Sequence, residues 1–158
     1  MTTTWDERIG QFWATLDESE PELALAAMRA LVDERPHGDP EALYEWASIH
    51  DSLGLVAEAI PLYRAAIDGG LDGPRKPQAT IQLASSLRNV GEPDEAIQLL
   101  RNLPADEVTG DSAQAFLALA LRDVSRHDEA LRTALTAFAR TLPRYRRSVE
   151  NYAKELTD

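Results

Sequence analysis

The residues whose chemistry suits catalysis or metal binding are few and scattered. His37 lies in a segment rich in proline and glycine, His50 lies late in a predicted helix, and His127 lies in a predicted turn. Protein zinc sites use ligands at recurring short spacings such as His-x-x-x-His, and these three histidines form no such pattern. The chain has no cysteine, which excludes disulfides, thiolate catalysis and cysteine-ligated zinc. We expect the histidines to be structural or solvated.

Two other patterns fail as reactive sites. The glycine-rich stretch at residues 69–73 follows a predicted helix, whereas a phosphate-binding loop follows a strand. The acidic residues are scattered over predicted helix faces, so they are better explained as solvated surface than as paired catalytic carboxylates. No nucleophile is placed beside a base. The sequence therefore predicts no enzyme activity, no cofactor and no bound metal.

A basic cluster close to the C-terminus stands out from this background. Arg144, Arg146 and Arg147 follow Pro143, which is predicted to begin a helix. Three positive charges in a first helical turn oppose the helix dipole, at a cost of about 0.3–1 kcal/mol each when exposed. An acidic partner should compensate for them. That partner is either a neighbour within this acidic chain or an external molecule.

The elements that position these residues are predicted to be helices. The 158 residues are 44% hydrophobic but only 6% aromatic, and alanine and leucine predominate, a composition that favours closely packed helices. A net charge of −11 argues against general nucleic-acid binding. We see neither a secretory signal nor an apolar run of membrane-spanning length. We therefore expect a cytoplasmic protein that does not bind membranes.

Three segments of the chain repeat one pattern. Residues 39–67, 76–103 and 111–138 each contain an amphipathic helix, a short turn and a second amphipathic helix. Residues 68–77 form the one long predicted loop. Pro40, Pro77 and Pro93 suit the first turn of a helix, Asp39 suits an N-cap, and Asp111 with Gln114 resembles a capping box.

Small residues recur in a fixed register through these segments. Each repeat has two alanines 12 residues apart, preceded by a turn residue five positions before the second alanine; the pairs are Ala47 and Ala59, Ala84 and Ala96, and Ala118 and Ala130, and the turn residues are Gly54, Gly91 and Ser125. Two antiparallel helices approach closely where both side chains are small, and a tight turn favours a residue that tolerates unusual backbone angles. The register therefore predicts paired antiparallel helices.

The two ends of the chain depart from the pattern. Ala24 and Ser19 keep the register, but Phe12 stands where the other repeats have alanine, as expected of a terminal repeat. An apolar stripe from Tyr145 to Leu156 predicts a lone closing helix. We predict nine helices in one domain, divided into a divergent repeat at 1–36, repeats at 39–71, 76–108 and 111–142, and a capping helix at 143–158.

The repeat spacing of 34–37 residues, the two small positions, the turn glycine and the late aromatic Tyr63 resemble the tetratricopeptide repeat (TPR) family. The bulky position of the first helix falls on Leu43, but Thr80 and Gln114 replace it in later repeats. Residues 81–101 and 142–153 are more particularly similar to a small bacterial subgroup of single-domain repeat proteins. The resemblance implies a right-handed superhelix of about four stacked helix pairs, protein–protein interaction and no reaction.

In this family the first helix of each pair lines a concave face, which implies where a partner would bind. The residues assigned to peptide binding on that face are Tyr44, Gln78, Gln82, Ser85, Arg88, Asn89, Phe116, Arg122 and Arg146. Glu41, Glu45 and Asp51 lie toward the N-terminal end of the same face, and Arg88 and Arg122 are 34 residues apart in equivalent positions. An acidic ligand is therefore expected over the C-terminal half.

The predicted function is that of an adaptor or scaffold that binds a peptide or protein segment in this groove. The alternative is a structural protein that uses the repeat surface to form homodimers, in which the acidic end of one subunit meets the basic end of the other.

Overall fold

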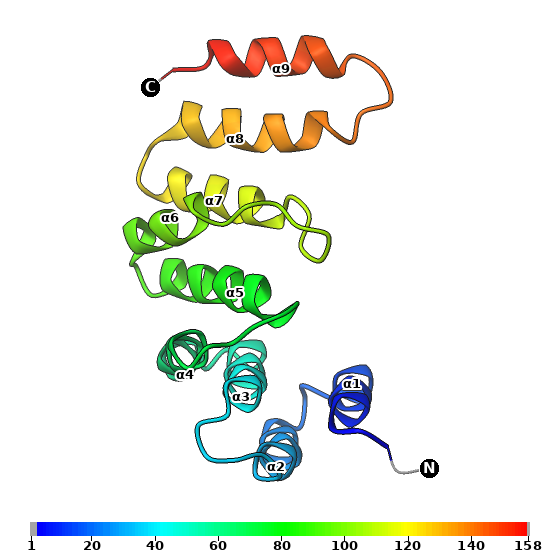
Figure 1. Ribbon diagram of the computed structural model, residues 1–158. Helices are drawn as coiled ribbons and strands as arrows, with labels where there is room; N and C mark the ends of the chain where they lie inside the picture. Colours follow the sequence, from blue (N-terminus) through cyan, green and yellow to red (C-terminus); the bar gives the residue numbers. More distant parts are fainter. Residues whose placement is uncertain (1–2, 158) are drawn as a thin grey trace. The chain divides into compact units, whose positions relative to one another are not determined.

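The protein is described by a computed structural model that covers residues 3–157, and within that range it has nine α-helices and no β-strand (Figure 1). The helices are α1 (Trp5–Thr15), α2 (Pro21–Val32), α3 (Pro40–Ser52), α4 (Val56–Asp68), α5 (Arg75–Asn89), α6 (Pro93–Arg101), α7 (Ser112–Asp123), α8 (His127–Ala139) and α9 (Arg146–Glu155). The prediction of an all-α fold with helices in sequential pairs is confirmed.

Two compact units divide the chain, Met1–Gln82 and Leu83–Asp158, and the boundary falls within α5. In the first unit α1 packs on α2, α2 on α3, and α3 on α4. In the second unit α6 packs on α7, α7 on α8, and α8 on α9. The repeat boundaries given above stay a prediction.

Helix starts in the first unit follow local capping chemistry. Thr4 forms a full capping box with Glu7, in which each side chain bonds the other residue's backbone N–H. The Asp39 carboxylate accepts a hydrogen bond from the Ala42 N–H at 3.0 Å, and Pro40 follows at the first helical position, so the predicted cap of α3 is confirmed.

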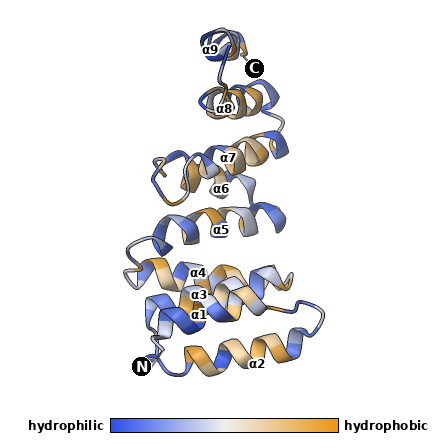
Figure 2. Ribbon diagram, turned by 90° about the vertical axis from the view of Figure 1, so that its right-hand side faces the viewer, coloured by the Kyte–Doolittle hydropathy of each residue, from blue (hydrophilic) through white to orange (hydrophobic). Residues whose placement is uncertain are grey.

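The apolar core of the first unit joins the N-terminal helix pair to α3. Ile9 of α1, Met28 of α2 and Ile49 of α3 are buried in one cluster, and Phe12 packs against it. Figure 2 shows the long hydrophobic stretch of α2 that supplies Met28. The segment that departs most from the repeat pattern is therefore a fully packed part of the fold.

The three turns singled out in the sequence have the backbone conformation expected of them. Gly54, Gly91 and Ser125 have φ angles of 77°, 87° and 63°. Such positive values are natural for glycine and costly for serine, so the turn geometry is kept at Ser125 despite its side chain. Ser19 is not among the residues with positive φ; its N–H and hydroxyl instead bond the Asp17 carboxylate at 2.9 and 2.6 Å.

The alanine register corresponds to buried positions with one exception. Ala47, Ala59, Ala84 and Ala96 are at most 1% exposed, and Ala130 is 7% exposed. Ala118 is only half-buried, and Ala120 and Leu121 occupy the fully buried positions of α7 instead.

Three local predictions for the second unit are wrong. A second long connection, residues 102–111, follows α6. Within it, the Asp106 carboxylate accepts hydrogen bonds from the Val108 and Thr109 N–H groups (each 2.7 Å), which stabilise a compact turn. Asp111 stands at the N-cap position of α7 as expected, but it makes no side-chain cap; its carboxylate pairs with Arg140 at 2.6 Å. The last helix begins at Arg146, after Tyr145 at φ 65°, so Pro143 and Arg144 precede it.

Replacing Ala84 by leucine tests this packing. Ala84 is 1% exposed, so the larger side chain must displace its neighbours, and we expect Ala84→Leu to lower the free energy of unfolding by about 1–3 kcal/mol. Urea denaturation followed by circular dichroism measures the change. The matched control is Ala115→Leu, at an exposed position of α7, for which about 0.5 kcal/mol or less is expected. Equal stability of the two variants would refute the assigned register.

Candidate functional site

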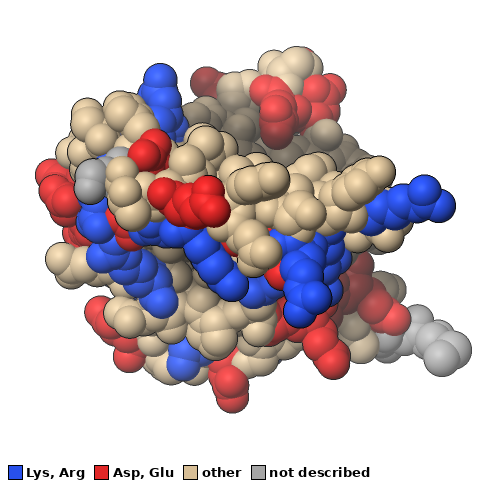
Figure 3. Space-filling model, turned by 90° about the horizontal axis from the view of Figure 1, so that it is seen from above, with Lys and Arg blue, Asp and Glu red and all other residues tan. Residues whose placement is uncertain are grey.

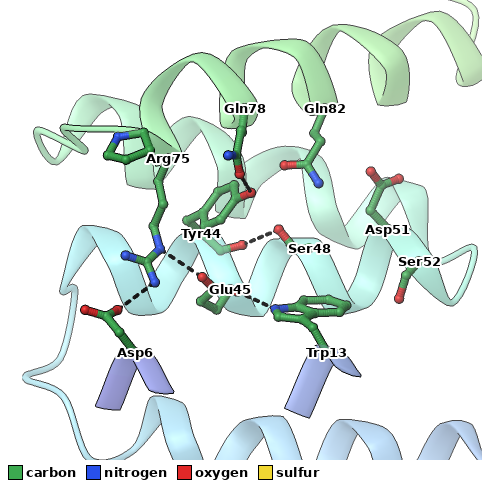
Figure 4. A pocket seen from close by; sticks show the side chains of 11 residues that line it. Asp6, Trp13, Tyr44, Glu45, Ser48, Asp51, Ser52, Arg75, Gln78 and Gln82 are labelled. Carbon is green, nitrogen blue, oxygen red and sulfur yellow. Dashed lines mark hydrogen bonds and ion pairs between the residues drawn. The ribbon is translucent and has the colours of Figure 1, made fainter. Parts of the chain in front are cut away.

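A polar cleft of about 740 Å³ opens within the first unit, between α1, α3 and the start of α5 (Figure 4). Its lining is made mostly of hydrogen-bonding side chains: Asp6, Trp13, Tyr44, Glu45, Ser48, Asp51, Ser52, Pro74, Arg75, Gln78 and Gln82. Tyr44, Ser48 and Asp51 share one face of α3 because they lie about one turn apart. Gln78 and Gln82 face them from α5 for the same reason.

One end of the cleft is closed by a network around Arg75. Its Nε donates to Glu45 Oε1 at 2.9 Å, and its Nη2 donates to Asp6 Oδ1 at 2.8 Å. The second oxygen of Glu45 accepts from Trp13 Nε1 at 2.8 Å. Glu45 is only 3% exposed, so both of its oxygens are satisfied where water is scarce.

The surroundings of Arg75 keep its guanidinium protonated. Burial lowers the pKa of its guanidinium, but the hydrogen bonds and negative charges of Glu45 and Asp6 outweigh burial, so that the pKa is raised overall. The guanidinium also lies 5.5 Å from the centre of the Trp5 ring. Arg75 therefore links α1 to α3 from the start of α5 as a permanent cation.

Two buried tyrosines belong to this region: Tyr44 lines the cleft, and Tyr63 contacts two of the lining residues. The Tyr44 hydroxyl donates to Gln78 Oε1 at 2.9 Å, and burial together with the charge of Glu45 raises the Tyr44 pKa to about 12. The Tyr63 hydroxyl lies 3.4 Å from Ser48 Oγ and 3.3 Å from Asp51 Oδ2, and burial raises its pKa as well. Both phenols stay protonated near neutral pH, so they act as hydrogen-bond donors and not as bases.

Gln82 is the unsatisfied member of the lining. Its Oε1 is buried and finds no donor among the residues that the structure describes. A buried acceptor without a partner costs about 1–3 kcal/mol, so a fold tolerates few of them. In Figure 4 the Gln82 side chain extends from α5 toward the end of the cleft where Asp51 and Ser52 lie, away from Arg75.

The structure brings together three of the nine predicted binding residues, Tyr44, Gln78 and Gln82. Sequence reasoning missed Asp6, Trp13 and Arg75 as parts of this site. The signal for Asp6 and Trp13 was their separation of seven residues, which places both on one side of a helix. Nothing local marked Arg75, because its partners lie 30 and 69 residues away.

The other predicted residues belong to the second unit, where one acidic residue lies beside two of the arginines. Arg88 forms an ion pair with Asp123 at 2.5 Å, and Arg122 lies 3.5 Å from the same carboxylate although its side chain is 71% exposed. The remaining predicted residues of this unit are placed as follows: Ser85 and Phe116 are half-buried and Asn89 is exposed. The two arginines thus share one carboxylate, and an acidic ligand at this place stays a prediction.

Within the basic cluster Arg144, Arg146 and Arg147, Arg146 has an acidic partner nearby in the chain. Arg146 Nε donates to Glu150 Oε1 at 2.8 Å, one turn along α9, and this bond lowers the Glu150 pKa. Arg144 lies before the helix, so only Arg146 and Arg147 occupy its first turn. Viewed from the end that carries α9, basic and acidic groups are interspersed on the surface (Figure 3).

The second unit also has a hollow of about 670 Å³ beside α6 and α8. Arg101 and Arg140 contribute to it, but each pairs with a carboxylate at 2.6 Å, Glu129 and Asp111 respectively. Among residues 3–157, no group of three His, Asp or Glu side chains is arranged to hold a metal ion. No helix in the described part of the chain has the length and apolar character to cross a membrane.

Comparison with known proteins identifies the family to which this fold belongs. A family model described as Tetratrico peptide repeat matches residues 40–156, about three quarters of the chain, from the start of α3 to the end of α9. No curated protein and no solved structure matches the sequence. Repeats of this family are generally non-catalytic modules of protein–protein interaction. The helix pairs, their positive-φ turns and the family match agree, and the chain belongs to the tetratricopeptide repeat family.

Proposed function

We propose that this protein is an adaptor or scaffold that binds an extended segment of another polypeptide in the cleft of its first unit. The observation that carries the proposal is the pair of amide side chains on α5, Gln78 and Gln82, which line the cleft, with the Gln82 oxygen lacking a partner. An amide both donates and accepts hydrogen bonds, as a peptide backbone does.

The spacing of the two amides suits an extended chain. Four residues of α-helix advance about 6 Å along the helix axis. Two residues of an extended chain advance about 6.6 Å, after which the backbone presents the same edge again. Gln78 and Gln82 can therefore bond alternate residues of one peptide. Tyr44 positions the first amide by its hydrogen bond to Gln78 Oε1.

A selection experiment tests the proposal. A displayed library of random heptapeptides is panned against the wild-type protein, and the selected peptides are synthesised and titrated by calorimetry. We expect Gln78→Ala with Gln82→Ala to weaken binding by about ten-fold or more, since each lost hydrogen bond contributes about 0.5–1.5 kcal/mol. Gln11→Ala with Gln98→Ala removes two exposed amides elsewhere and should leave affinity unchanged. Equal loss in both double variants would contradict binding in the cleft.

Homodimerisation is the second candidate. On α8, Leu131 and Phe138 are 48% and 57% exposed and lie seven residues apart, so both fall on one side of the helix. An apolar stripe of this kind can pair with its own copy about a two-fold axis. Light scattering on the wild-type protein and on Leu131→Asp with Phe138→Asp decides the matter. A monomeric wild type at high micromolar concentration would reject this candidate.

A further inference from the structure

We infer that the cleft selects a basic segment, and that an arginine or lysine side chain of the ligand lies at the end of the cleft formed by Asp51, Ser52 and Gln82. This inference rests on the proposed function and specifies its ligand. It is opposite in sign to the acidic ligand that the sequence suggested for the C-terminal half.

The first argument is the charge of the lining. Asp6, Glu45 and Asp51 contribute three carboxylates, and Arg75 contributes the one cation among the eleven lining residues. Arg75 is already paired with acidic residues, since its guanidinium bonds Glu45 and Asp6 and lies 3.5 Å from Glu41. The cleft therefore has a net negative charge, and an acidic ligand would have to displace existing carboxylates to reach its only cation.

The second argument is a count of hydrogen-bond donors. The Trp13 N–H already donates to Glu45, and the Tyr44 hydroxyl already donates to Gln78. The hydroxyls of Ser48 and Ser52 donate to the backbone oxygens of Tyr44 and Ile49, at 2.9 and 3.1 Å. Among the described side chains that line the cleft, only the two glutamine NH2 groups and the remaining N–H groups of Arg75, at the closed end, are left as donors.

Acceptors, in contrast, remain in excess. A hydroxyl that donates its one proton still offers lone pairs, and an ionised carboxylate only accepts. Gln82 Oε1 has no donor at all. That oxygen is covered by neighbouring atoms, and a half-turn of the amide, whose terminal torsion is soft, presents it to the cleft. A ligand that complements this lining must be rich in donors, as guanidinium and ammonium groups are.

The arrangement of the cleft indicates where the cation lies. Arg75 and its carboxylate partners occupy one end, and Figure 4 shows Asp51, Ser52 and Gln82 at the other, with the Trp13 ring beneath. A cation at this second end stays away from Arg75 and faces the Asp51 carboxylate and an aromatic ring, and a half-turn of the Gln82 amide would add its oxygen. Aromatic rings and carboxylates both attract guanidinium groups, so this end fits arginine best.

Three synthetic peptides test the inference by calorimetry. They are nonapeptides of glycine and serine with three alternate positions occupied by arginine, by its neutral isostere citrulline, or by glutamate. We expect the arginine peptide to bind about ten-fold or more tightly than the citrulline peptide, and the glutamate peptide to show no binding. Tighter binding of the glutamate peptide would overturn the inference.

Charge variants locate the binding. We expect Gln82→Glu to strengthen and Gln82→Lys to weaken binding of the arginine peptide, each by several-fold, while Gln98→Glu and Gln98→Lys on exposed α6 leave it unchanged. Asp51→Asn should weaken binding more than Glu107→Gln, which removes the same charge from the exposed loop before α7. Circular dichroism confirms that each variant is folded, and the Gln82 variants do not disturb the contact between Asp51 and Tyr63.

The outcomes separate this inference from the proposed function. If Asp51→Asn and Glu107→Gln weaken binding equally, the arginine peptide responds only to the overall charge of −11, and the inference is wrong. If the library yields peptides that require Gln78 and Gln82 but contain no basic residue, the proposed function stands and this inference fails. If no peptide requires those glutamines, both are wrong.

Discussion

Between pH 10 and pH 12 the free energy of unfolding is expected to fall by about 1.4 kcal/mol per pH unit for each of two buried tyrosines. Burial raises the pKa of Tyr44 from 10.0 to about 12, and it raises the pKa of Tyr63 as well. The unfolded chain releases these protons near pH 10, whereas the folded protein keeps them. The stabilisation is therefore complete below pH 10 and is lost as the pH rises toward 12.

Urea denaturation at a series of pH values from 8 to 12 measures this slope, which should approach about 3 kcal/mol per unit when both tyrosines contribute. Tyr44→Phe and Tyr63→Phe should each remove about half of it. Tyr152→Phe is the matched control, because Tyr152 is 68% exposed on α9, and its profile should match that of the wild type. A slope that both buried-site variants leave unchanged would show that other groups cause the alkaline unfolding.

The second large effect is expected at Glu45. Replacement by leucine leaves the Arg75 Nε and the Trp13 Nε1, which now donate to Glu45 at 2.9 and 2.8 Å, without acceptors. Removing one partner of a buried ion pair costs about 3–5 kcal/mol. Since the Arg75 side chain is 20% exposed and also reaches Asp6, we expect Glu45→Leu to cost about 3 kcal/mol, near the lower limit of that range.

Two variants control this experiment. Glu45→Gln keeps an acceptor for one donor and loses only the charge, so its cost should be smaller. Glu34→Leu removes the surface ion pair with Arg8, whose side chains are 38% and 40% exposed, and should cost about 1 kcal/mol or less. Thermal or urea unfolding compares all three. If Glu45→Leu is no more destabilising than Glu34→Leu, the network around Arg75 does not hold α1 against α3.

The repeat organisation could be predicted because its physical causes are local. The positive φ of Gly54, Gly91 and Ser125 follows from turns only a few residues long. The burial of Ala47 and Ala59 follows from two amphipathic helices joined by such a turn. The same reasoning failed where a local and a distant partner compete for one side chain. Asp111 can cap α7 or pair with Arg140, and the distant arginine is the partner it takes.

The predicted start of the last helix was wrong for a similar reason. Proline at the first helical position is a sound local expectation, but Pro143 and Arg144 lie before α9, and Tyr145 turns the chain with a φ of 65° before the helix begins. The tyrosine has no local preference for that conformation. The start of α9, which packs on α8, therefore does not follow from local sequence preferences.

The sequence by itself determined the class of the fold, the pairing of its helices and the turns between them, because helical periodicity, small contact residues and turn residues act within about forty residues of one another. Only the tertiary structure decided which polar groups share a cleft. Asp6 and Arg75, 69 residues apart, meet there with Glu45, which accepts hydrogen bonds from Arg75 and Trp13, while Gln82 Oε1 finds no donor among the described residues. Which hydrogen bonds remain open to a ligand depends on all the others already made, and that balance exists only once the chain has folded.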